Sequence, residues 1–314
     1  MEPYIVQRRV EYLPWSADAY ARNGWEFCVG SAQSCTAFAE GGAIRVPWGE
    51  RPEPARQRDA RSLILKPSAK ALRDTAPPAW LRELTALEHL FMPSTMVRGL
   101  QPDALPASLV GLTLQNVAGA RAALGKDDPR WPAAVSLPNV KALRLLDEPG
   151  AEQSKTLLGL SATNLPALEY VECLVHRSVG RLDAIRTFPR LQFAWLEFVR
   201  SYDIVEYIGG PVRALSLVSA DAKFPFEHLS RLDTTELLRL NGMACVVDCA
   251  VLTALPRLRE LTVYNSKKFA NLEALLACER LESIEFVNCG RPFGRALREQ
   301  LESRTYERLE IAFA

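Results

Sequence analysis

The sequence is poor in the side chains that most enzymes use for catalysis. Its 314 residues include three histidines, and residues 1–80 contain none. None of the three lies in a metal-binding phrase such as H-E-x-x-H, and the chain has no glycine-rich phosphate loop, nucleophile elbow or kinase signature. We therefore expect no enzymatic activity, no cofactor and no metal ion.

Cysteine is used in a way that excludes a disulfide-stabilised fold. The seven cysteines are an odd number at irregular spacings. Cys245 and Cys249 are spaced as half of a zinc site, but a closed site needs two more ligands, and no second pair lies at a usable spacing. We expect these two side chains to pack in the interior, and we expect Cys28 and Cys35 to be free thiols.

Long apolar runs and an excess of charge are missing as well. No run approaches the roughly 20 apolar residues that a membrane-spanning helix needs, and the N-terminus lacks the apolar stretch of a signal peptide. The formal net charge is +1, so no overall field draws the chain to nucleic acid or to an anionic membrane. These absences favour a cytoplasmic protein that binds neither nucleic acid nor membrane.

What the sequence does have is a repeated phrase. From Leu87 onward, apolar residues return at positions 1, 4 and 6 of a Leu-x-x-Leu-x-Leu pattern, most often at intervals of 23 residues. Self-similarity at a fixed period is typical of solenoids, in which each unit packs on its neighbours. The copies begin at Leu87, Leu109, Val140, Leu168, Leu191, Val212, Thr235, Leu258, Leu281 and Tyr306.

Each copy is predicted to run strand, turn, helix and return. Positions 4 and 6 are two residues apart, which is the period of a β-strand, so both side chains point to the same face. An apolar-proline pair such as Leu255-Pro256 precedes several copies and closes the preceding segment. Helical spacing follows the strands, as in the sets Phe269, Leu272, Leu275, Leu276 and Phe293, Leu297, Leu301.

With this pattern, the chain resembles the leucine-rich-repeat family, whose phrase is L-x-x-L-x-L-x-x-N/C-x-L. The resemblance covers roughly residues 81–314. It implies an α/β solenoid with a curved parallel sheet on the concave side and short helices on the convex side. The family places Asn or Cys at position 9, where this chain has a match at Cys289, whereas Asn116, Asn265 and Asn288 fall at position 8. We therefore expect an irregular turn after the strand and no regular asparagine ladder.

Two stretches do not follow the repeat. The long interval between the copies at Leu109 and Val140 carries an insertion at residues 125–132, which we expect to be an exposed loop. Residues 1–80 are predicted to be an N-terminal cap that covers the end of the solenoid. From about residue 41 this region contains one or two degenerate repeats, at Ile44-x-Val46 and Leu63-x-Leu65. A separate functional domain is the alternative for residues 1–80.

The residues between the repeat leucines predict a binding surface. If positions 4 and 6 point inward, positions 3, 5 and 7 line the concave face of the sheet. Two adjacent copies would place Tyr170, Phe193 and Trp195 in one patch, and exposed aromatic clusters often mark interaction sites. Coverage by the cap, the insertion or another subunit is the alternative, as is a register error of one residue. The candidate partner-binding residues are Tyr170, Glu172, Phe193, Trp195, Glu197, Arg239, Glu260, Tyr264 and Glu285.

The charge of this face suggests the kind of partner. Over positions 2, 3, 5 and 7, acidic residues outnumber basic ones although the whole chain is close to neutral. This sign disfavours nucleic acid and favours a protein with a basic surface. We therefore expect a non-catalytic protein-binding module, with an inhibitor or immunity protein for a bacterial toxin or another enzyme as a subtype. The alternative is a secreted effector or adaptor whose first 80 residues carry the activity and whose repeats select the target.

Overall fold

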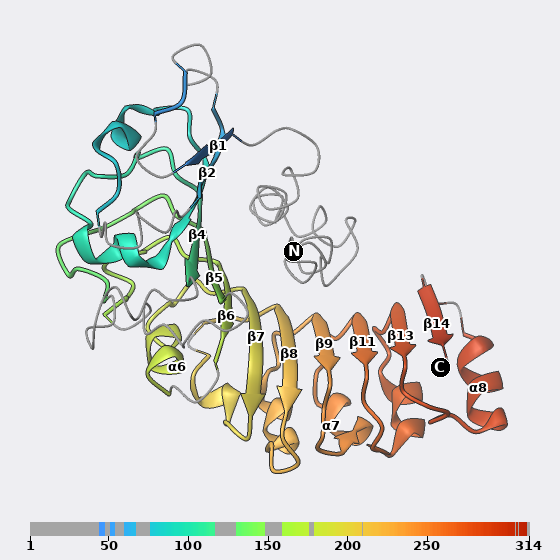
Figure 1. Cartoon of the computed structure of the whole chain (residues 1–314). Coiled ribbons are helices and arrows are strands. Elements are labelled where there is room, and N and C mark those ends of the chain that lie inside the picture. Colours follow the sequence, from blue (N-terminus) through green and yellow to red (C-terminus); the bar gives the residue numbers. More distant parts are fainter. Residues whose placement is uncertain are drawn as a thin grey trace. The chain divides into compact units, whose positions relative to one another are not determined.

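A computed structural model shows the arrangement of the chain (Figure 1). It describes residues 44–47, 51–53, 60–66, 76–116, 130–147, 159–175, 179–208, 210–304, 306 and 308–312. The chain divides into two compact units. Unit 1 comprises Met1–Cys173 and Ser178–Arg190, and unit 2 comprises Leu174–Arg177 and Leu191–Ala314.

The strands of unit 1 pair in parallel in the order in which they occur in the sequence. The two crude phrases in the first 80 residues form its first strands, and Ile44 pairs with Leu63, which pairs with Leu90. The strands are β1 (Ile44–Pro47), β2 (Ser62–Lys66), β3 (His89–Pro93), β4 (Gly111–Asn116), β5 (Ala142–Asp147) and β6 (Tyr170–Leu174). The helices are η2 (Ala79–Glu83), η3 (Ser94–Gly99) and α6 (Val179–Ile185).

Unit 2 repeats the same plan more regularly. Its main strands are parallel neighbours, and several of them are seen side by side in Figure 1. They are β7 (Phe193–Arg200), β8 (Ala214–Ala220), β9 (Leu237–Asn241), β11 (Glu260–Tyr264), β13 (Ser283–Val287) and β14 (Arg308–Ala312). The segments that return to the next strand contain η4 (Ile204–Glu206), η5 (Phe226–Arg231), α7 (Cys249–Leu252), η6 (Leu272–Ala277), α8 (Arg295–Glu302) and a second small sheet of β10 (Val247–Asp248) and β12 (Phe269–Ala270).

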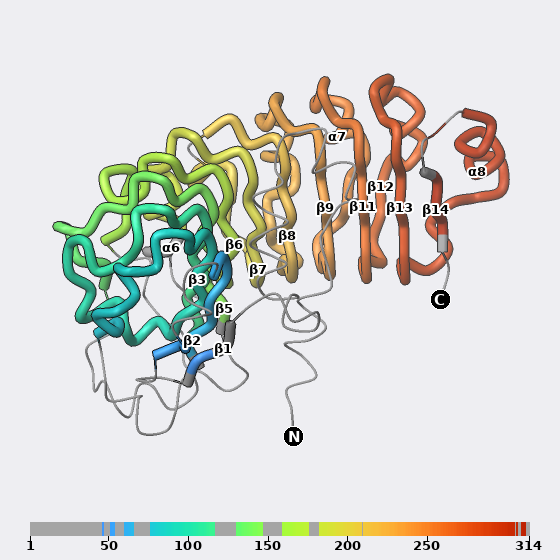
Figure 2. Tube along the Cα trace, turned by 90° about the horizontal axis from the view of Figure 1, so that it is seen from above, coloured from blue at the N-terminus to red at the C-terminus, as the bar shows by residue number. Residues whose placement is uncertain are grey.

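The repeated apolar positions form the core, as predicted. From the copy at Leu87 to the copy at Leu281, every side chain at positions 1, 4 and 6 is buried. The strands also pair in the register of the phrase, so that Leu112 lies beside Leu143 and Val263 beside Phe286. The fold is therefore a leucine-rich-repeat solenoid. The successive repeats can be followed along the tube in Figure 2. In the described part of the chain no helix is long and apolar enough to cross a membrane.

Most of the turns that lead into a strand share one backbone hydrogen bond; Val212, which donates to Gly210 instead, is an exception. The N–H of position 1 donates to the carbonyl three residues earlier, as from Val140 to Leu137 (3.3 Å) and from Leu258 to Leu255 (3.1 Å). The proline of the apolar-proline pair occupies the second residue of this turn, where its fixed φ is favourable. The apolar partner of each pair is buried, which anchors the turn to the core.

The return segments differ from the prediction in their kind of helix. Most of the described helices are 3₁₀, and Phe269 lies in the short strand β12 rather than in a helix. Leu297 and Leu301 are in the predicted helix α8, but Phe293 precedes it. A unit of about 23 residues spends most of its length on the strand and two turns, so only one or two helical turns fit in the remainder.

The turn after the strand is also more regular than predicted in unit 2. Position 8 is in the left-handed conformation in five successive copies, at Phe198, Ser219, Gly242, Asn265 and Asn288. Asparagine tolerates this conformation better than most residues. The two asparagines that fall one place early are therefore where the backbone needs them, and the expectation of an irregular turn was wrong for this unit.

A side-chain ladder accompanies this turn. The Nδ2 of Asn288 donates to Oδ1 of Asn265 (2.6 Å), and the Nδ2 of Asn265 donates to Oδ1 of Asn241 (2.9 Å). One residue later, Ser266 Oγ accepts from the backbone N–H of Met243 (3.1 Å), and Cys289 Sγ donates to the Val263 carbonyl (3.4 Å). In these two copies position 9 thus ties the turn to the preceding copy.

Parts of two further predictions lie outside the described residues. These are residues 1–43 of the predicted cap, with Cys28 and Cys35, and the insertion up to residue 129. The end of the insertion is described and contradicts an exposed loop at that point. Trp131 is buried, and its Nε1 donates to the Val135 carbonyl (3.0 Å).

Candidate protein-binding surface

We call the side of each sheet that carries positions 3, 5 and 7 the sheet face. Most of its side chains are buried, including the aromatic patch that was expected to be exposed. Tyr170, Phe193 and Trp195 are 5%, 1% and 7% exposed. The register of the repeat is as predicted, so a slip of one residue does not explain the burial. The six other candidate residues are also buried or partly buried. Glu172, Glu197, Arg239, Glu260 and Glu285 are buried, and Tyr264 is partly exposed.

The most elaborate contacts of the sheet face lie in unit 2, around Arg239. Its guanidinium carbon is 5.5 Å from the centre of the Trp195 ring and 5.1 Å from that of the Tyr264 ring. Trp195, Ser216 and Arg239 are position 5 of β7, β8 and β9 and lie in one row across the sheet. Because Ser216 is small, the long arginine side chain can cross β8 to reach the indole.

Carboxylates lie on the same sheet face as this stack, and one of them contacts it. The hydroxyl of Tyr264 donates to Oε1 of Glu285 at 2.6 Å, which connects β11 to β13. Glu197 is position 7 of β7 and Glu260 is position 3 of β11, and both are buried. We call Trp195, Arg239, Tyr264 and Glu285 the Arg239 cluster. A cation between two aromatic rings, with acids around it, is a rigid arrangement of side chains with strong electrostatic character.

Two polar atoms beside Arg239 have no hydrogen-bond partner in the part of the chain that the structure describes. They are Nε1 of Trp195 and Oγ of Ser216, and both are buried. An N–H or O–H that is buried without an acceptor loses its hydration without compensation. Such groups therefore mark a place where a hydrogen-bond acceptor would be favourable.

Unit 1 contributes a different kind of contact. Arg144 Nε donates to Oε2 of Glu172 at 2.7 Å, with both side chains 4% exposed, and the Tyr170 hydroxyl donates to the same oxygen at 2.8 Å. Tyr170 and Glu172 belong to unit 1, whereas Phe193, Trp195 and Glu197 belong to unit 2. The single patch expected from these five residues therefore stays a prediction.

Much of the charge that the sequence placed on this surface is neutralised at position 2. There, bases and acids of successive copies pair across the strands, most clearly in Arg213–Glu236 (3.0 Å) and Arg259–Glu282 (2.8 Å). The hydrogen bond to Glu282 raises the pKa of Arg259. Lys141–Glu169 (3.5 Å) and Arg61–Glu88 (2.6 Å) are the equivalent pairs of unit 1. Only positions 3, 5 and 7 then give the sheet face its own charge.

The thiols and histidines take no part in the Arg239 cluster. Cys245 and Cys249 are buried and free, and burial raises the pKa of the Cys249 thiol to about 12. Among the described residues, no group of His, Cys, Asp and Glu could hold a metal ion. His89 lies on the sheet face of unit 1, where burial lowers its pKa. Sequence reasoning missed it, although counting to position 3 from Leu87 would have found it.

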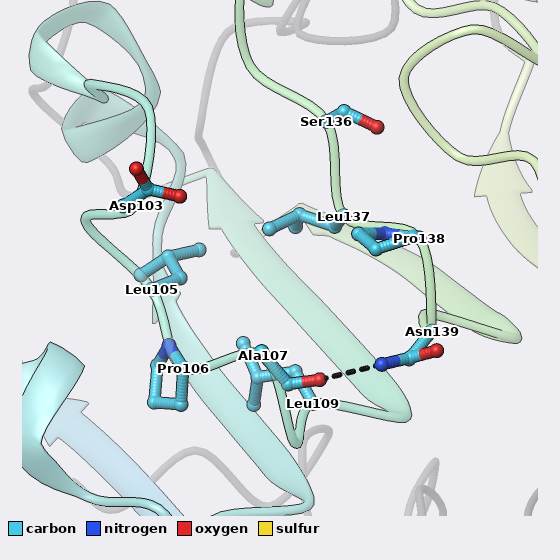
Figure 3. A pocket seen from close by; sticks show the side chains of 9 residues that line it. All are labelled: Asp103, Leu105, Pro106, Ala107, Leu109, Ser136, Leu137, Pro138 and Asn139. Atoms are coloured by element: carbon cyan, nitrogen blue, oxygen red, sulfur yellow. Dashed lines mark hydrogen bonds between the residues drawn. The ribbon is translucent and has the colours of Figure 1, made fainter.

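Two further features lie away from the cluster. In unit 2, Asp203 accepts from Arg231 Nη2 (2.9 Å) and lies 2.5 Å from His228 Nδ1. In unit 1, a pocket of about 140 Å³ lies between the turns that precede β4 and β5 (Figure 3). It is lined by Leu105, Leu109 and Leu137, and Asn139 Nδ2 donates to the Ala107 carbonyl across it (2.8 Å). Sequence reasoning predicted neither feature.

Comparisons with known proteins add little to this picture. No protein-family model matches the chain, and no curated protein matches it. Among solved structures, the chain is similar to a leucine-rich-repeat protein of Leptospira interrogans, with a TM-score of 0.43 and 16% sequence identity. The match covers 86% of this chain and 73% of that one.

Proposed function

We propose that the chain is a non-catalytic protein-binding module whose contact surface is the sheet face of unit 2. The observation that carries this proposal is the Arg239 cluster, in which a guanidinium is stacked between Trp195 and Tyr264. Trp, Tyr and Arg are the residue types that most often dominate binding energy in protein interfaces. Three of them held in place by one another lose little conformational freedom when a partner docks.

The charge of the sheet face supports a basic protein partner. Around Arg239, unit 2 carries Glu197, Glu260, Glu285 and Glu310 at positions 3, 5 and 7. A basic surface would be attracted by these carboxylates and would associate faster at low salt, whereas the phosphates of nucleic acid would be repelled. Inhibition of a basic enzyme, such as an immunity function against a toxin in the cytoplasm, is the narrower form of the proposal, and its support is this sign of charge.

The first experiment uses the full chain as bait in an extract of its native host, followed by purification of each captured protein. Trp195→Ala should weaken the binding of the true partner by more than about 2 kcal/mol, roughly 30-fold in Kd, if the indole is a central anchor. Tyr202→Ala is the matched control, because Tyr202 follows the same strand but lies outside the sheet face. Equal affinity of the Trp195 and Tyr202 variants would refute the assignment.

Salt provides a second arm of this experiment. The association rate should fall as ionic strength rises, because salt screens the attraction between two proteins of opposite local charge as they approach. A captured partner that is acidic, or an association rate that does not change with salt, would contradict the proposed role of the carboxylates.

A further inference from the structure

The pocket of unit 1 lies between two consecutive turns, those that lead into β4 and β5 (Figure 3). Among the described residues, these two turns share one hydrogen bond, from Asn139 Nδ2 to the Ala107 carbonyl (2.8 Å). The turns that lead into β5 and β6 are joined more firmly. Leu137 N–H donates to the Asn164 carbonyl (2.7 Å), and Asn164 Nδ2 donates to the Val135 carbonyl (2.9 Å). The turns before β4 and β5 therefore leave room between them.

The walls of this pocket are mainly apolar. The side chains of Leu105 and Leu137 come from the two turns and point toward each other across it, and Leu109 also lines it (Figure 3). Its volume is about 140 Å³, and apolar cavities of roughly 150 Å³ accommodate a molecule as large as benzene. A leucine side chain, with four carbon atoms, is smaller than benzene and fits this space. We call this site the Leu105 pocket.

One of the residues that line the Leu105 pocket is charged. Asp103 lies at the end of the pocket opposite Asn139 (Figure 3). Its side chain is exposed, and it makes no ion pair with the residues that the structure describes. Asp103 is the third residue of a turn in which Ala104 N–H donates to the Gln101 carbonyl (3.2 Å), and its φ is 60°. Glycine is the residue that this conformation favours, so the backbone does not require an acid here.

We propose that the Leu105 pocket receives a leucine side chain of a partner segment that has a lysine or arginine next to this leucine. The leucine would lose water-exposed apolar surface against Leu105 and Leu137, which favours binding. The neighbouring cation would lie near the carboxylate of Asp103, whereas an acidic residue in its place would be repelled. This site belongs to unit 1 and shares no residue with the Arg239 cluster, so the proposal does not rest on the proposed function.

The proposal is tested on the full chain with short peptides. The leucine methyl groups are ¹³C-labelled, and those of Leu105 and Leu137 are assigned by their disappearance in Leu105→Ile and Leu137→Ile. Acetyl-Gly-Leu-Lys-Gly-amide should shift both sets of methyl signals with a millimolar Kd, as suits the docking of one side chain. Replacing the leucine of the peptide by alanine should weaken binding about tenfold or more. Replacing the lysine by glutamate should weaken it about threefold, because the charged pair is exposed.

Two variants of the chain locate the binding. Ala107→Phe places a ring at the pocket and should abolish the shifts, whereas Ala134→Phe, at an exposed alanine that does not line it, should leave them unchanged. Asp103→Asn keeps a residue that accepts a positive φ and should remove the preference for lysine over glutamate. The same shifts in the Ala107→Phe chain, or no shift in the unmodified chain, would overturn the proposal. A preference for lysine that survives in Asp103→Asn would contradict the role of the carboxylate.

Discussion

The two units are built from the same phrase, but only in unit 2 does the turn after the strand keep one conformation from copy to copy. In unit 2 the copies at Val212, Thr235, Leu258 and Leu281 are 23 residues apart, and position 8 is left-handed in each of them. In unit 1 the intervals are uneven, and the equivalent residues Ser94, Asn116 and Asp147 are not left-handed. Equal length allows one backbone path to be copied with its hydrogen bonds, whereas an insertion changes the path of the return segment and with it the turn.

The largest test of this comparison concerns the core of each unit. Phe286→Ala in unit 2 should cost about 3–5 kcal/mol of unfolding free energy, because the ring is fully buried and packs edge-on against Phe293 (4.9 Å). Met92→Ala, at the same repeat position of unit 1, should cost about 2–5 kcal/mol. Hydrogen exchange would locate each loss. If the two units unfold independently, each variant should speed amide exchange mainly in the unit that carries the substitution. Equal increases in both units would show that they unfold together.

A smaller effect is expected at the left-handed turn. Asn265→Ala should destabilise the chain by about 1–2 kcal/mol, because alanine is unfavourable at a φ of 51° and cannot continue the ladder. Asn265→Gly keeps the conformation and loses only the ladder, so its cost in chemical denaturation should be clearly smaller. If both variants cost the same, the regularity of unit 2 comes from the side-chain ladder and not from the backbone.

The smallest effect is expected from the position-2 ion pairs. Both Arg213–Glu236 in unit 2 and Lys141–Glu169 in unit 1 are partly exposed. Double-mutant cycles should therefore give couplings of about 0.2–1 kcal/mol, which decrease as salt is added. We expect the stronger coupling in unit 2, where the guanidinium binds both carboxylate oxygens. A stronger coupling in unit 1 would contradict the view that this edge is better ordered in unit 2.

The core positions of the repeat could be predicted from the sequence. Positions 1, 4 and 6 could be assigned because one leucine-rich face with a period of two has only one way to be buried. Even the weak phrases at Ile44 and Leu63 were placed in register. The regular turn was within reach, since Gly242, Asn265 and Asn288 are all residue types that accept a positive φ. The family phrase places its Asn or Cys at position 9, whereas the left-handed residue of this chain is at position 8.

For the sheet face, the sequence predicted which residues lie there but not that they would be buried. The side chains at positions 3, 5 and 7 are those that counting indicated, and four of them meet in the Arg239 cluster. Their burial could not be predicted, because the repeat specifies which way a side chain points and not what lies above it. The stack across β8 also depends on the small side chain of Ser216, which no motif identifies.

The 23-residue spacing between Thr235, Leu258 and Leu281 has an evolutionary consequence. A duplication of one such repeat would begin and end at equivalent points of the backbone. The new copy could therefore pack on its neighbours through the contacts that the existing copies already make. Each insertion would move everything beyond it by one strand spacing, about 4.8 Å. Glu285, for example, would then lie one strand farther from Tyr264. The length of this protein, and the grid of side chains it presents, could thus change in steps by gene duplication alone.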